Sequence, residues 1–364
     1  MDTDQDLSIL ALGGDGIGPE ILDQGLRVAR HIAECHGYTF DIQHDVLHGR
    51  SYDLHGVFCT EDVLEKAGKA DAVLVGAVGG PDWDNIRMPG GAEHQDGLMY
   101  LRHHLQSYLG LRPARAWRQL LHQTPFRNDV VKGTDILILR EMCGGAMFAR
   151  ERGQHIVENR RQGYDLTAYN EDEIRRFAIG GFELARQRRS KLVSCDKSNV
   201  MESYKLWRQV VTEVAADYPD VHFEHMLADN CGYQMVMRPR DFDVVLCCNQ
   251  LGDIFSDLTA SHAGSLGMLP SACLCATPNG DRVKGIYEST SGSAPDIAGQ
   301  GIANPIGMIL SVGMMFEFTL CRPDLNNVII EAVDTALDDG QLTRDIGGDL
   351  TSVQMTDAII ERLV

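Results

Sequence analysis

Short apolar runs alternate along this chain with longer amphipathic stretches, and this alternation constrains the fold more than any other feature. Two stretches, residues 171–189 and 202–219, carry apolar residues three and four positions apart, which is the helical period. Four runs have the length and composition of strands buried on both faces: residues 71–79 (DAVLVGAVG), 135–141 (DILILRE), 191–197 (KLVSCDK) and 242–249 (FDVVLCCN). Such an alternation predicts an α/β fold.

Composition and charge exclude several classes of protein. With 364 residues, 44% hydrophobic and 23% charged, the chain is long enough for one large domain or two ordinary ones. Its net charge of -19 argues against duplex nucleic acid or an anionic membrane as a partner, because both attract a basic face. No repeat, low-complexity tract or linker-like stretch stands out, so composition alone marks no domain boundary.

The sequence predicts a cytoplasmic protein. The acidic start MDTDQDLS lacks the basic and apolar regions of a signal peptide. The longest apolar run, residues 307–320, is too short to span a bilayer and contains Glu317, so it predicts a buried helix. The ten cysteines are scattered without a CxxC pair, which favours reduced core residues over disulfides or a zinc site.

A glycine-rich stretch, GGDGIGPE at residues 13–20, follows the first apolar run. The Rossmann fingerprint needs glycines at positions one, three and six, but counting from Gly14 places Pro19 at the sixth position. A lysine for a Walker loop is also missing. Pro19 and Glu20 suit the first turn of a helix, so the stretch predicts a strand-to-helix turn of another kind, with a structural and a ligand-binding role both open.

Acidic side chains gather near the ends of two predicted strands. Asp253 and Asp257 are spaced i, i+4 and share one face of a predicted helix, where like charges repel. A hard cation such as Mg²⁺ or Mn²⁺ would turn that repulsion into coordination, and Asp229 is a candidate third ligand. Exposed acids on a helix face are the alternative interpretation.

Basic side chains form a complementary set. Arg102, Arg112 and Arg140 each lie in an apolar neighbourhood, where a guanidinium needs an anionic partner. That partner is either a substrate carboxylate or a protein salt bridge. Lys197 ends a predicted strand, where burial and a nearby metal would suit it to proton transfer, or where it is simply paired. The pattern indicates metal-assisted chemistry on a small polyanion.

A colinear series of motifs resembles the isocitrate/isopropylmalate dehydrogenase family of NAD(P)-dependent β-hydroxyacid oxidative decarboxylases. The series runs nearly from end to end of the chain: GGDGIGPE, GAVGGPDWD, DGLMYLR, LRP, REMCGG, CDKSNVMES, GDIFSD, GSLGMLPSA and GSAPDIAGQGIANP. The resemblance implies a two-domain α/β fold that is not a Rossmann fold. A discontinuous cofactor-binding domain would comprise residues 1–107 and 264–364, and residues 108–263 would form the substrate, metal and dimerisation domain. It also implies a homodimer with active sites shared between subunits.

The resemblance also implies roles at the positions that match. Arg102, Arg112 and Arg140 would hold the carboxylates of a dicarboxylate substrate. Mg²⁺ or Mn²⁺ would bind to Asp229, Asp253 and Asp257, and Lys197 and Asp229 would reach in from the neighbouring subunit, with Lys197 removing a proton. The wall around the substrate's 3-substituent would include Leu98, Met99 and Val200.

For the cofactor, the resemblance implies a site around the GSAPDIAG and IANP motifs. Asp296 would accept a hydrogen bond from the adenosine ribose and repel a 2′-phosphate, which favours NAD over NADP. Asn304 would face the adenine. The remaining candidates lie in the same loop: Ser291, Gly292, Ser293, Ala294 and Ile297.

Two positions depart from the family pattern. Met147 stands where the family has the tyrosine that usually donates a proton, and a thioether has no proton to give. Ser291 replaces a histidine beside the cofactor. Tyr233, four residues after Asp229, is a speculative substitute acid if that segment is helical. Gln95 stands where an acid is usual, which loosens the assignment of an isopropyl substituent.

Three interpretations therefore compete. The first is an active NAD-dependent dehydrogenase that oxidises and decarboxylates 3-isopropylmalate or another 3-substituted malate. The second is a catalytically impaired paralogue that acts as a ligand-binding or regulatory subunit, although intact metal-binding positions weigh against it. The third, an unrelated acidic binding protein, would require the whole motif series to be accidental.

Overall fold

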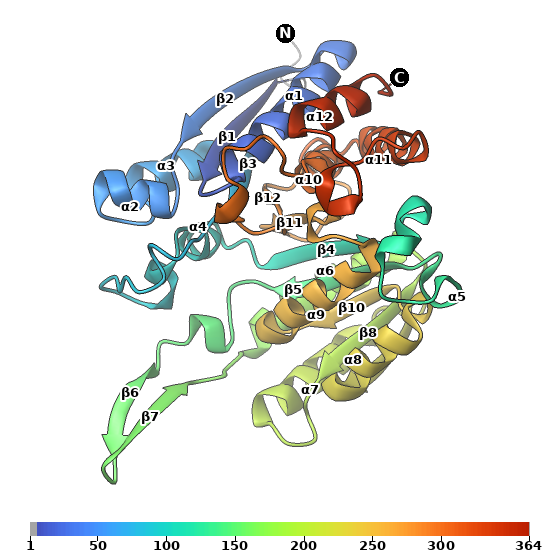
Figure 1. The fold of residues 1–364 in the computed structure, drawn as a ribbon. Coiled ribbons are helices and arrows are strands. Elements are labelled where there is room, and N and C mark those ends of the chain that lie inside the picture. Colours follow the sequence, from blue (N-terminus) through green and yellow to red (C-terminus); the bar gives the residue numbers. More distant parts are fainter. Residues whose placement is uncertain (1–5, 364) are drawn as a thin grey trace.

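A ten-stranded mixed sheet runs through the molecule (Figure 1) in the computed structural model, which describes residues 6–363. Its strand order is β2-β1-β3-β12-β11-β4-β5-β10-β8-β9. Two parallel blocks flank β11 and β4, which each run antiparallel to both neighbours. The strands are β1 (Asp6–Gly14), β2 (Thr39–Asp45), β3 (Ala72–Ala77), β4 (Leu109–Arg115), β5 (Asp135–Glu141), β8 (Lys191–Asp196), β9 (His222–Leu227), β10 (Val244–Cys247), β11 (Pro270–Leu274) and β12 (Gly285–Ser289).

Helices cover both faces of this sheet. In the half that holds β1, β3 and β12, α1 and α10 pack on one face and α3 and α4 on the other. In the half that holds β5, β8 and β10, α6 and α7 cover one face and α8 and α9 the other. The helices are α1 (Gly18–His36), α2 (Gly49–His55), α3 (Glu61–Lys69), α4 (Gly97–Leu105), α5 (Asn128–Val131), α6 (Glu171–Arg186), α7 (Glu202–Ala215), α8 (Ala228–Met237), α9 (Asn249–Ala263), α10 (Ile306–Phe318), α11 (Pro323–Asp338) and α12 (Ser352–Ile360).

The apolar runs form the core strands, which confirms the α/β fold. β3, β5, β8 and β10 lie within the four predicted strands and are almost entirely buried. α6 starts at a capping box, in which Asn170 and Glu173 satisfy each other's backbone N–H groups. α10 is the predicted buried helix, and Glu317 is the residue that keeps it from being wholly buried. None of the helices within residues 6–363 is long and apolar enough to cross a membrane.

Both ends of the chain build one half of the sheet, and the middle builds the other. In Figure 1 the blue N-terminal strands lie beside the orange and red C-terminal elements, whereas the green and yellow segments form the opposite half. The change from one half to the other falls between β11 and β4. The exact domain boundaries at residues 107/108 and 263/264 stay a prediction, and residues 1–5 and 364 lie outside the described residues.

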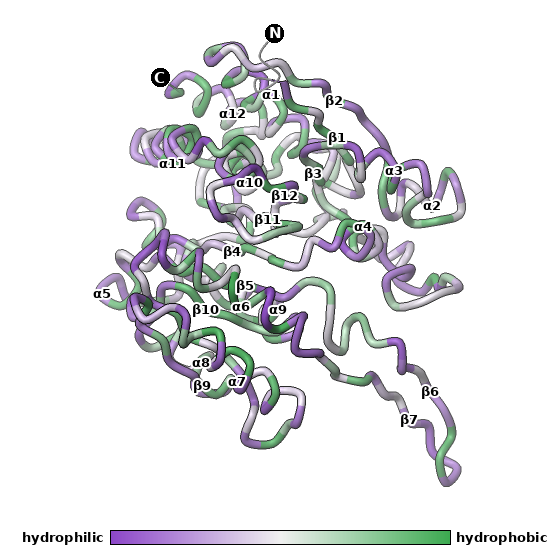
Figure 2. The backbone as a smooth tube through the Cα atoms, turned by 180° about the vertical axis from the view of Figure 1, so that it is seen from behind, coloured by the Kyte–Doolittle hydropathy of each residue, from purple (hydrophilic) through white to green (hydrophobic). Residues whose placement is uncertain are grey.

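A hairpin of β6 (Arg152–Val157) and β7 (Arg160–Asp165) projects from the second half (Figures 1 and 2). Every residue of both strands is exposed, including Ile156 at 73% and Tyr164. A two-stranded hairpin is at best marginally stable alone, and exposed strand edges readily pair with another chain.

The cysteines behave as the sequence predicts. All ten are free thiols, and six of them are buried: Cys59, Cys195, Cys231, Cys247, Cys248 and Cys273.

Candidate functional site

The glycine-rich turn between β1 and α1 braces the loop that holds the predicted cofactor site. Gly16 has φ +55, and a Cβ there would lie 1.9 Å from the carbonyl oxygen of Ser293. The N–H of Ile17 donates to that same oxygen at 2.8 Å. Glu20 accepts hydrogen bonds from the N–H groups of Gly301 (3.2 Å) and Ala303 (3.0 Å). The turn therefore supports residues 293–303 rather than forming a Rossmann phosphate loop.

The predicted cofactor residues lie on this loop, in differing environments. Asp296 is exposed. Asn304 is buried, and its amide is already used: it donates to Asp345 at 3.0 Å and accepts from the N–H of Ile306 at 2.9 Å. The hydroxyl of Ser291 accepts from Ser289 at 3.0 Å. Gly292 and Ala294 take positive φ, and Ser293 and Ile297 are half-buried.

Two of the predicted arginines share one buried carboxylate. Arg102 on α4 and Arg112 on β4 both donate to Glu288 on β12, the second at 3.3 Å. Burial alone would raise the pKa of Glu288, but the two guanidinium charges together lower it below its usual range. Nε of Arg102 and Nε of Arg112 are buried and have no hydrogen-bond partner within the described chain. The site therefore keeps unused donor capacity for an anion.

Arg140, at the end of β5, has a different set of partners. It donates to Asp253 and, at 2.9 Å, to the amide oxygen of Asn249, both on α9. Burial lowers its pKa to about 10, and the nearby charges of Arg112 and Arg102 add to that effect against the opposing charge of Asp253. A substrate carboxylate among the three arginines would relieve this repulsion.

The predicted metal ligands fall into two groups in one chain. Asp253 and Asp257 lie on α9, and partial burial together with the charge of Asp253 raises the pKa of Asp257. A divalent cation would relieve that repulsion, so the oxygen donors fit Mg²⁺ or Mn²⁺. Asp229, on α8, instead pairs with Lys197 at 2.5 Å. Across residues 6–363 no three acidic, histidine or cysteine side chains lie close enough to hold a metal.

The Lys197–Asp229 pair lies on a surface of α8 and the end of β8. Tyr233 lies on α8, one turn after Asp229, and is 58% exposed. The segment is therefore helical, as the candidate role of Tyr233 assumes. Val200 is also exposed, at 67%. Neither Lys197 nor Asp229 has a hydrogen bond or ion pair with Arg140, Asp253 or Asp257 among the interactions of the described residues. Within the described residues, the pair therefore has no polar contact with Arg140 or with the acids on α9.

Met147 lies in a short 3₁₀ helix (Ala146–Phe148) against the arginine cluster. Its sulfur accepts a hydrogen bond from Arg140 at 3.3 Å. The turn that leads to it is shaped by Glu141, which accepts from the N–H groups of Cys143 (2.9 Å) and Gly144 (2.7 Å). Complete burial raises the pKa of Glu141 to about 7, although both hydrogen bonds oppose that rise.

The proposed substituent wall has one buried and two accessible members. Leu98 on α4 packs into the core with Leu10, Leu12 and Ile286, whereas Met99 is half-buried and Val200 exposed. The side chain of Gln95 holds the preceding turn. Its amide donates to the carbonyl of Met88 at 2.7 Å and accepts from the N–H of Met88 at 3.1 Å.

Sequence reasoning missed the groups that hold the arginines in place. Glu288 lies inside the apolar run GIYES, and an acid in a buried strand signals a cationic partner. Asn249 starts α9, just beyond the buried strand β10. Its amide donates to the carbonyl of Gly144 at 3.1 Å and accepts from Arg140.

Comparisons with known proteins agree with this architecture. The model of the isocitrate/isopropylmalate dehydrogenase family matches residues 8–362. A 3-isopropylmalate dehydrogenase of Xanthomonas euvesicatoria pv. vesicatoria is 46% identical over 360 residues, covering 98% of this chain and 99% of its own length. That of Aquifex aeolicus is 43% identical over 359 residues, covering 98% and 96%. The crystal structure of an isocitrate dehydrogenase from Methylococcus capsulatus superposes with a TM-score of 0.85 at 28% identity, covering 98% and 99%.

Proposed function

This chain belongs to the isocitrate/isopropylmalate dehydrogenase family, the decarboxylating dehydrogenases, and from that premise we propose that it oxidises and decarboxylates a 3-substituted malate with NAD and a divalent metal. The relatives named 3-isopropylmalate dehydrogenase make 3-isopropylmalate or a close analogue the first substrate to test. The observation that carries the proposal is the buried arginine cluster, because three guanidinium groups share two carboxylates and retain unused donors.

The chain's own residues suit this chemistry. Arg102, Arg112 and Arg140 would bind the two malate carboxylates and orient the C2–H bond, since planar guanidinium groups match carboxylates in pairs. A bound cation would polarise the 2-hydroxyl and its neighbouring carboxylate, and NAD would take the hydride. Asp253 and Asp257 would hold the cation, with Asp229 from a second subunit. Lys197, which would come from the second subunit beside Asp229, would remove the hydroxyl proton directly or through water.

The exposed loop from Ser291 to Ile297 is the proposed place for NAD. Asp296 has an exposed carboxylate that would accept from a ribose and repel a 2′-phosphate. The turn at Gly16 fixes this loop against α1, so the loop is held in place before the cofactor arrives. Leu98, Met99 and Val200 are apolar, so the 3-substituent would be alkyl or aryl rather than a third carboxylate.

Met147 and Ser291 support a second candidate, an impaired paralogue that binds ligand without full turnover. Met147 contacts Arg140 through sulfur, so the position of the usual acid offers no proton. One argument weighs against this candidate. Loss of the acid would lower the rate by about 10² to 10⁴-fold, and hydride transfer would survive that loss. Tyr233 on α8 remains a speculative substitute donor in a shared site.

The test is a paired assay of NADH and CO₂ with Mn²⁺ and a panel of 3-alkyl, 3-aryl and unsubstituted malates, tartrate and isocitrate. Equal yields of both products on an alkyl or aryl malate would support the proposal and point to a replacement acid. NADH without matching CO₂ would mean that oxidation and decarboxylation are uncoupled. No turnover on any substrate, with Mn²⁺ and NAD shown to bind, would favour the paralogue.

A further inference from the structure

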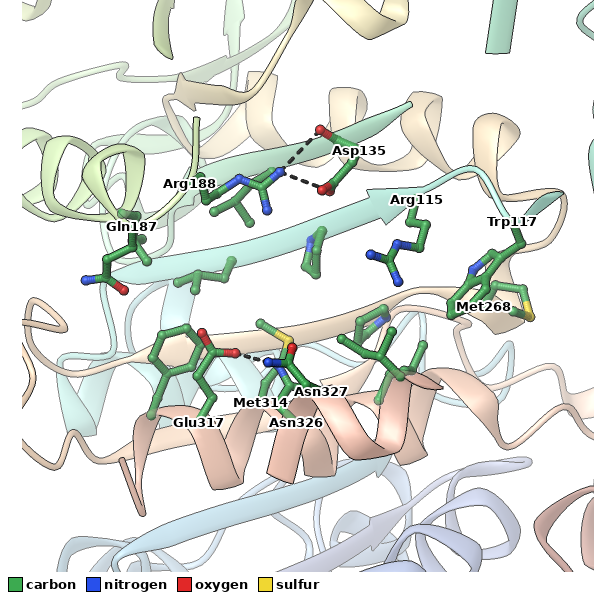
Figure 3. Close-up of a pocket in the computed structure, with 18 residues that line it drawn as sticks. Arg115, Trp117, Asp135, Gln187, Arg188, Met268, Met314, Glu317, Asn326 and Asn327 are labelled. Atoms are coloured by element: carbon green, nitrogen blue, oxygen red, sulfur yellow. Dashed lines mark hydrogen bonds and ion pairs between the residues drawn. The ribbon is translucent and has the colours of Figure 1, made fainter. Parts of the chain in front are cut away.

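A cavity of about 310 Å³ lies on the face of the sheet opposite the arginine cluster. Paired residues of neighbouring strands share a face, and β4 pairs with β5 so that Pro113 lies opposite Leu137 and Arg115 opposite Asp135. These four residues line the cavity (Figure 3). Arg112, between the lining residues Leu111 and Pro113 on β4, points to the other face, where it meets Glu288. The cavity is therefore separate from the proposed substrate site, although both lie on the same two strands.

Both halves of the molecule supply walls of this cavity. One wall comes from β4, β5 and the end of α6, and the facing wall comes from α10 and α11 (Figure 3). Hydrogen bonds close the boundary nearby: Gln187 donates to the carbonyl of Pro278 at 2.9 Å, and Gln119 donates to Asp338 at 2.5 Å. Its volume lies at the lower end of the range for small-molecule sites. The cavity therefore has the size of a small-ligand site.

The lining is mainly apolar, with polar groups at a few places. Leu111, Leu184, Leu310, Met314 and Phe318 supply apolar surface. A largely apolar lining with a few placed polar groups is the usual composition of an organic ligand's site.

Two of the four charged residues of the lining, Arg188 and Asp135, form an ion pair with each other. Arg188 donates to Asp135 at 2.9 Å and, behind the cavity wall, to Asp243 at 2.8 Å. Arg115 is exposed and lies over the ring of Trp117, 5.4 Å from its centroid. The lining charges that have no ion pair among the described residues are those of Arg115, at the exposed rim, and Glu317 on α10.

Glu317 is the acidic residue of the lining that has no ion pair among the described residues. Its Oε2 accepts one hydrogen bond, from the amide of Asn326 at 2.5 Å, and within the described chain Oε1 has none. Burial raises the pKa of this carboxyl group, against the opposing effects of Asn326 and the charge of Arg188. A half-buried carboxylate with one neutral donor lacks a cationic partner at contact distance.

We propose that this cavity binds a small organic cation with an apolar body, a protonated alkylamine or arylalkylamine, whose ammonium group donates to Oε1 of Glu317. The apolar body lies along Leu111, Leu184 and Leu310, and Arg115 lies at the exposed rim. An ammonium ion is a compact three-proton donor, so it satisfies Oε1 while leaving the bond from Asn326 in place.

The experiment is a calorimetric titration of the full-length protein with n-hexylamine at pH 7.5, beside 1-hexanol and hexanoate as probes of the same length. Hexylammonium binds saturably and at least about tenfold more tightly than hexanol, as one charge-assisted hydrogen bond requires. Hexanoate binds more weakly than either. Absence of saturable hexylammonium binding overturns the proposal, as does equal affinity for hexanol. Tighter binding of hexanoate would assign the cavity to an anion at Arg115 instead.

The matched variants are Glu317→Gln and Glu331→Gln. The first keeps the acceptor for Asn326 and removes the charge, whereas the second makes the same change at an exposed position on α11 outside the cavity. Glu317→Gln loses the preference for hexylammonium over hexanol, by about tenfold in affinity. Glu331→Gln behaves as the unmodified protein. Retained preference in Glu317→Gln would overturn the assignment of the cation to Glu317, whatever the outcome of the NADH and CO₂ assay.

Discussion

The guanidinium group of Arg140 donates a hydrogen bond to the sulfur of Met147, with 3.3 Å between nitrogen and sulfur. The same arginine meets Asp253 on its other side, so Met147 lies in contact with the group that would bind the substrate. A weak sulfur acceptor stands at the position where the family usually has a proton donor. This contact makes residue 147 the most informative site for separating the two candidate functions.

Met147→Tyr is expected to raise the yield of CO₂ relative to NADH, if the unmodified protein releases less CO₂ than NADH. The phenol supplies the missing proton, and acid catalysis is worth about 10² to 10⁴-fold in rate. Met147→Phe is the matched control, because it adds the ring without the hydroxyl. Both products are measured in one reaction mixture. An equal change in the two variants would show that ring packing, and not proton donation, is responsible.

Glu288→Gln is expected to lower the free energy of unfolding by about 3–5 kcal/mol, because it removes the carboxylate that Arg102 and Arg112 share in a buried site. Urea unfolding measures this loss. A dicarboxylate such as malate should restore more stability to the variant than it adds to the unmodified protein, since two guanidinium groups are then available to it. The exposed Glu331→Gln should stay within about 0.5 kcal/mol. Equal stability of the two variants would contradict the electrostatic account.

The core of this fold follows from local pattern. β5 begins and ends at the residues that the run DILILRE predicts. The short length of this apolar run favours a buried strand over a buried helix. The hairpin at β6 and β7 carries no such signal: its strands are polar and exposed, so periodicity does not mark them. The pairing of β11 with β4, which joins the two halves, depends on contacts between distant segments, which a single sequence does not reveal.

The candidate site was predictable in its residue types but not in its pairing. Burial of three arginines requires anions, and this part of the reasoning is confirmed by Glu288 and Asp253. Which acid meets which arginine depends on strand order, since Arg112 and Glu288 are 176 residues apart. The roles of Lys197, Asp229 and the NAD loop stay predictions, because they concern ligands and a second subunit.

Asp96→Asn is expected to destabilise the protein more at pH 6 than at pH 8.5. His48 is buried, lies 2.8 Å through Nδ1 from Asp15, and lies 3.5 Å through Nε2 from Asp96. Burial lowers its pKa, but the bond to Asp15 and the charges of Asp96, Asp15 and Asp84 together raise it above its ordinary value. Protonated His48 therefore stabilises the folded state. This stabilisation is fully present below pH 6.5, the unperturbed pKa, and is lost as the pH rises through the pKa of the folded state.

Asp96→Asn separates the charge of Asp96 from its role as the N-cap of α4. Asparagine can accept the same hydrogen bond from the N–H of Met99, so only the charge is removed. Melting temperatures across the pH range measure the difference between the variant and the unmodified protein. A difference that does not depend on pH would assign the effect of Asp96 to capping alone.

Mixing two inactive variants should restore activity if active sites are shared between subunits. Lys197 and Asp229 bond to each other at 2.5 Å and have no polar contact with Arg140 or Asp253 among the described residues. A shared site would bring the two groups together from different subunits. In a mixed dimer of Lys197→Met and Arg140→Met, one site receives Arg140 from the first subunit and Lys197 from the second, and the other site lacks both. Random reassortment makes half of the dimers mixed, so about a quarter of the unmodified activity is expected, measured as NADH formation after the mixture is unfolded and refolded together. Each variant refolded alone is the control. A mixture no more active than its components would place Lys197 and Arg140 in the same subunit's site, or leave the protein without a shared site at all.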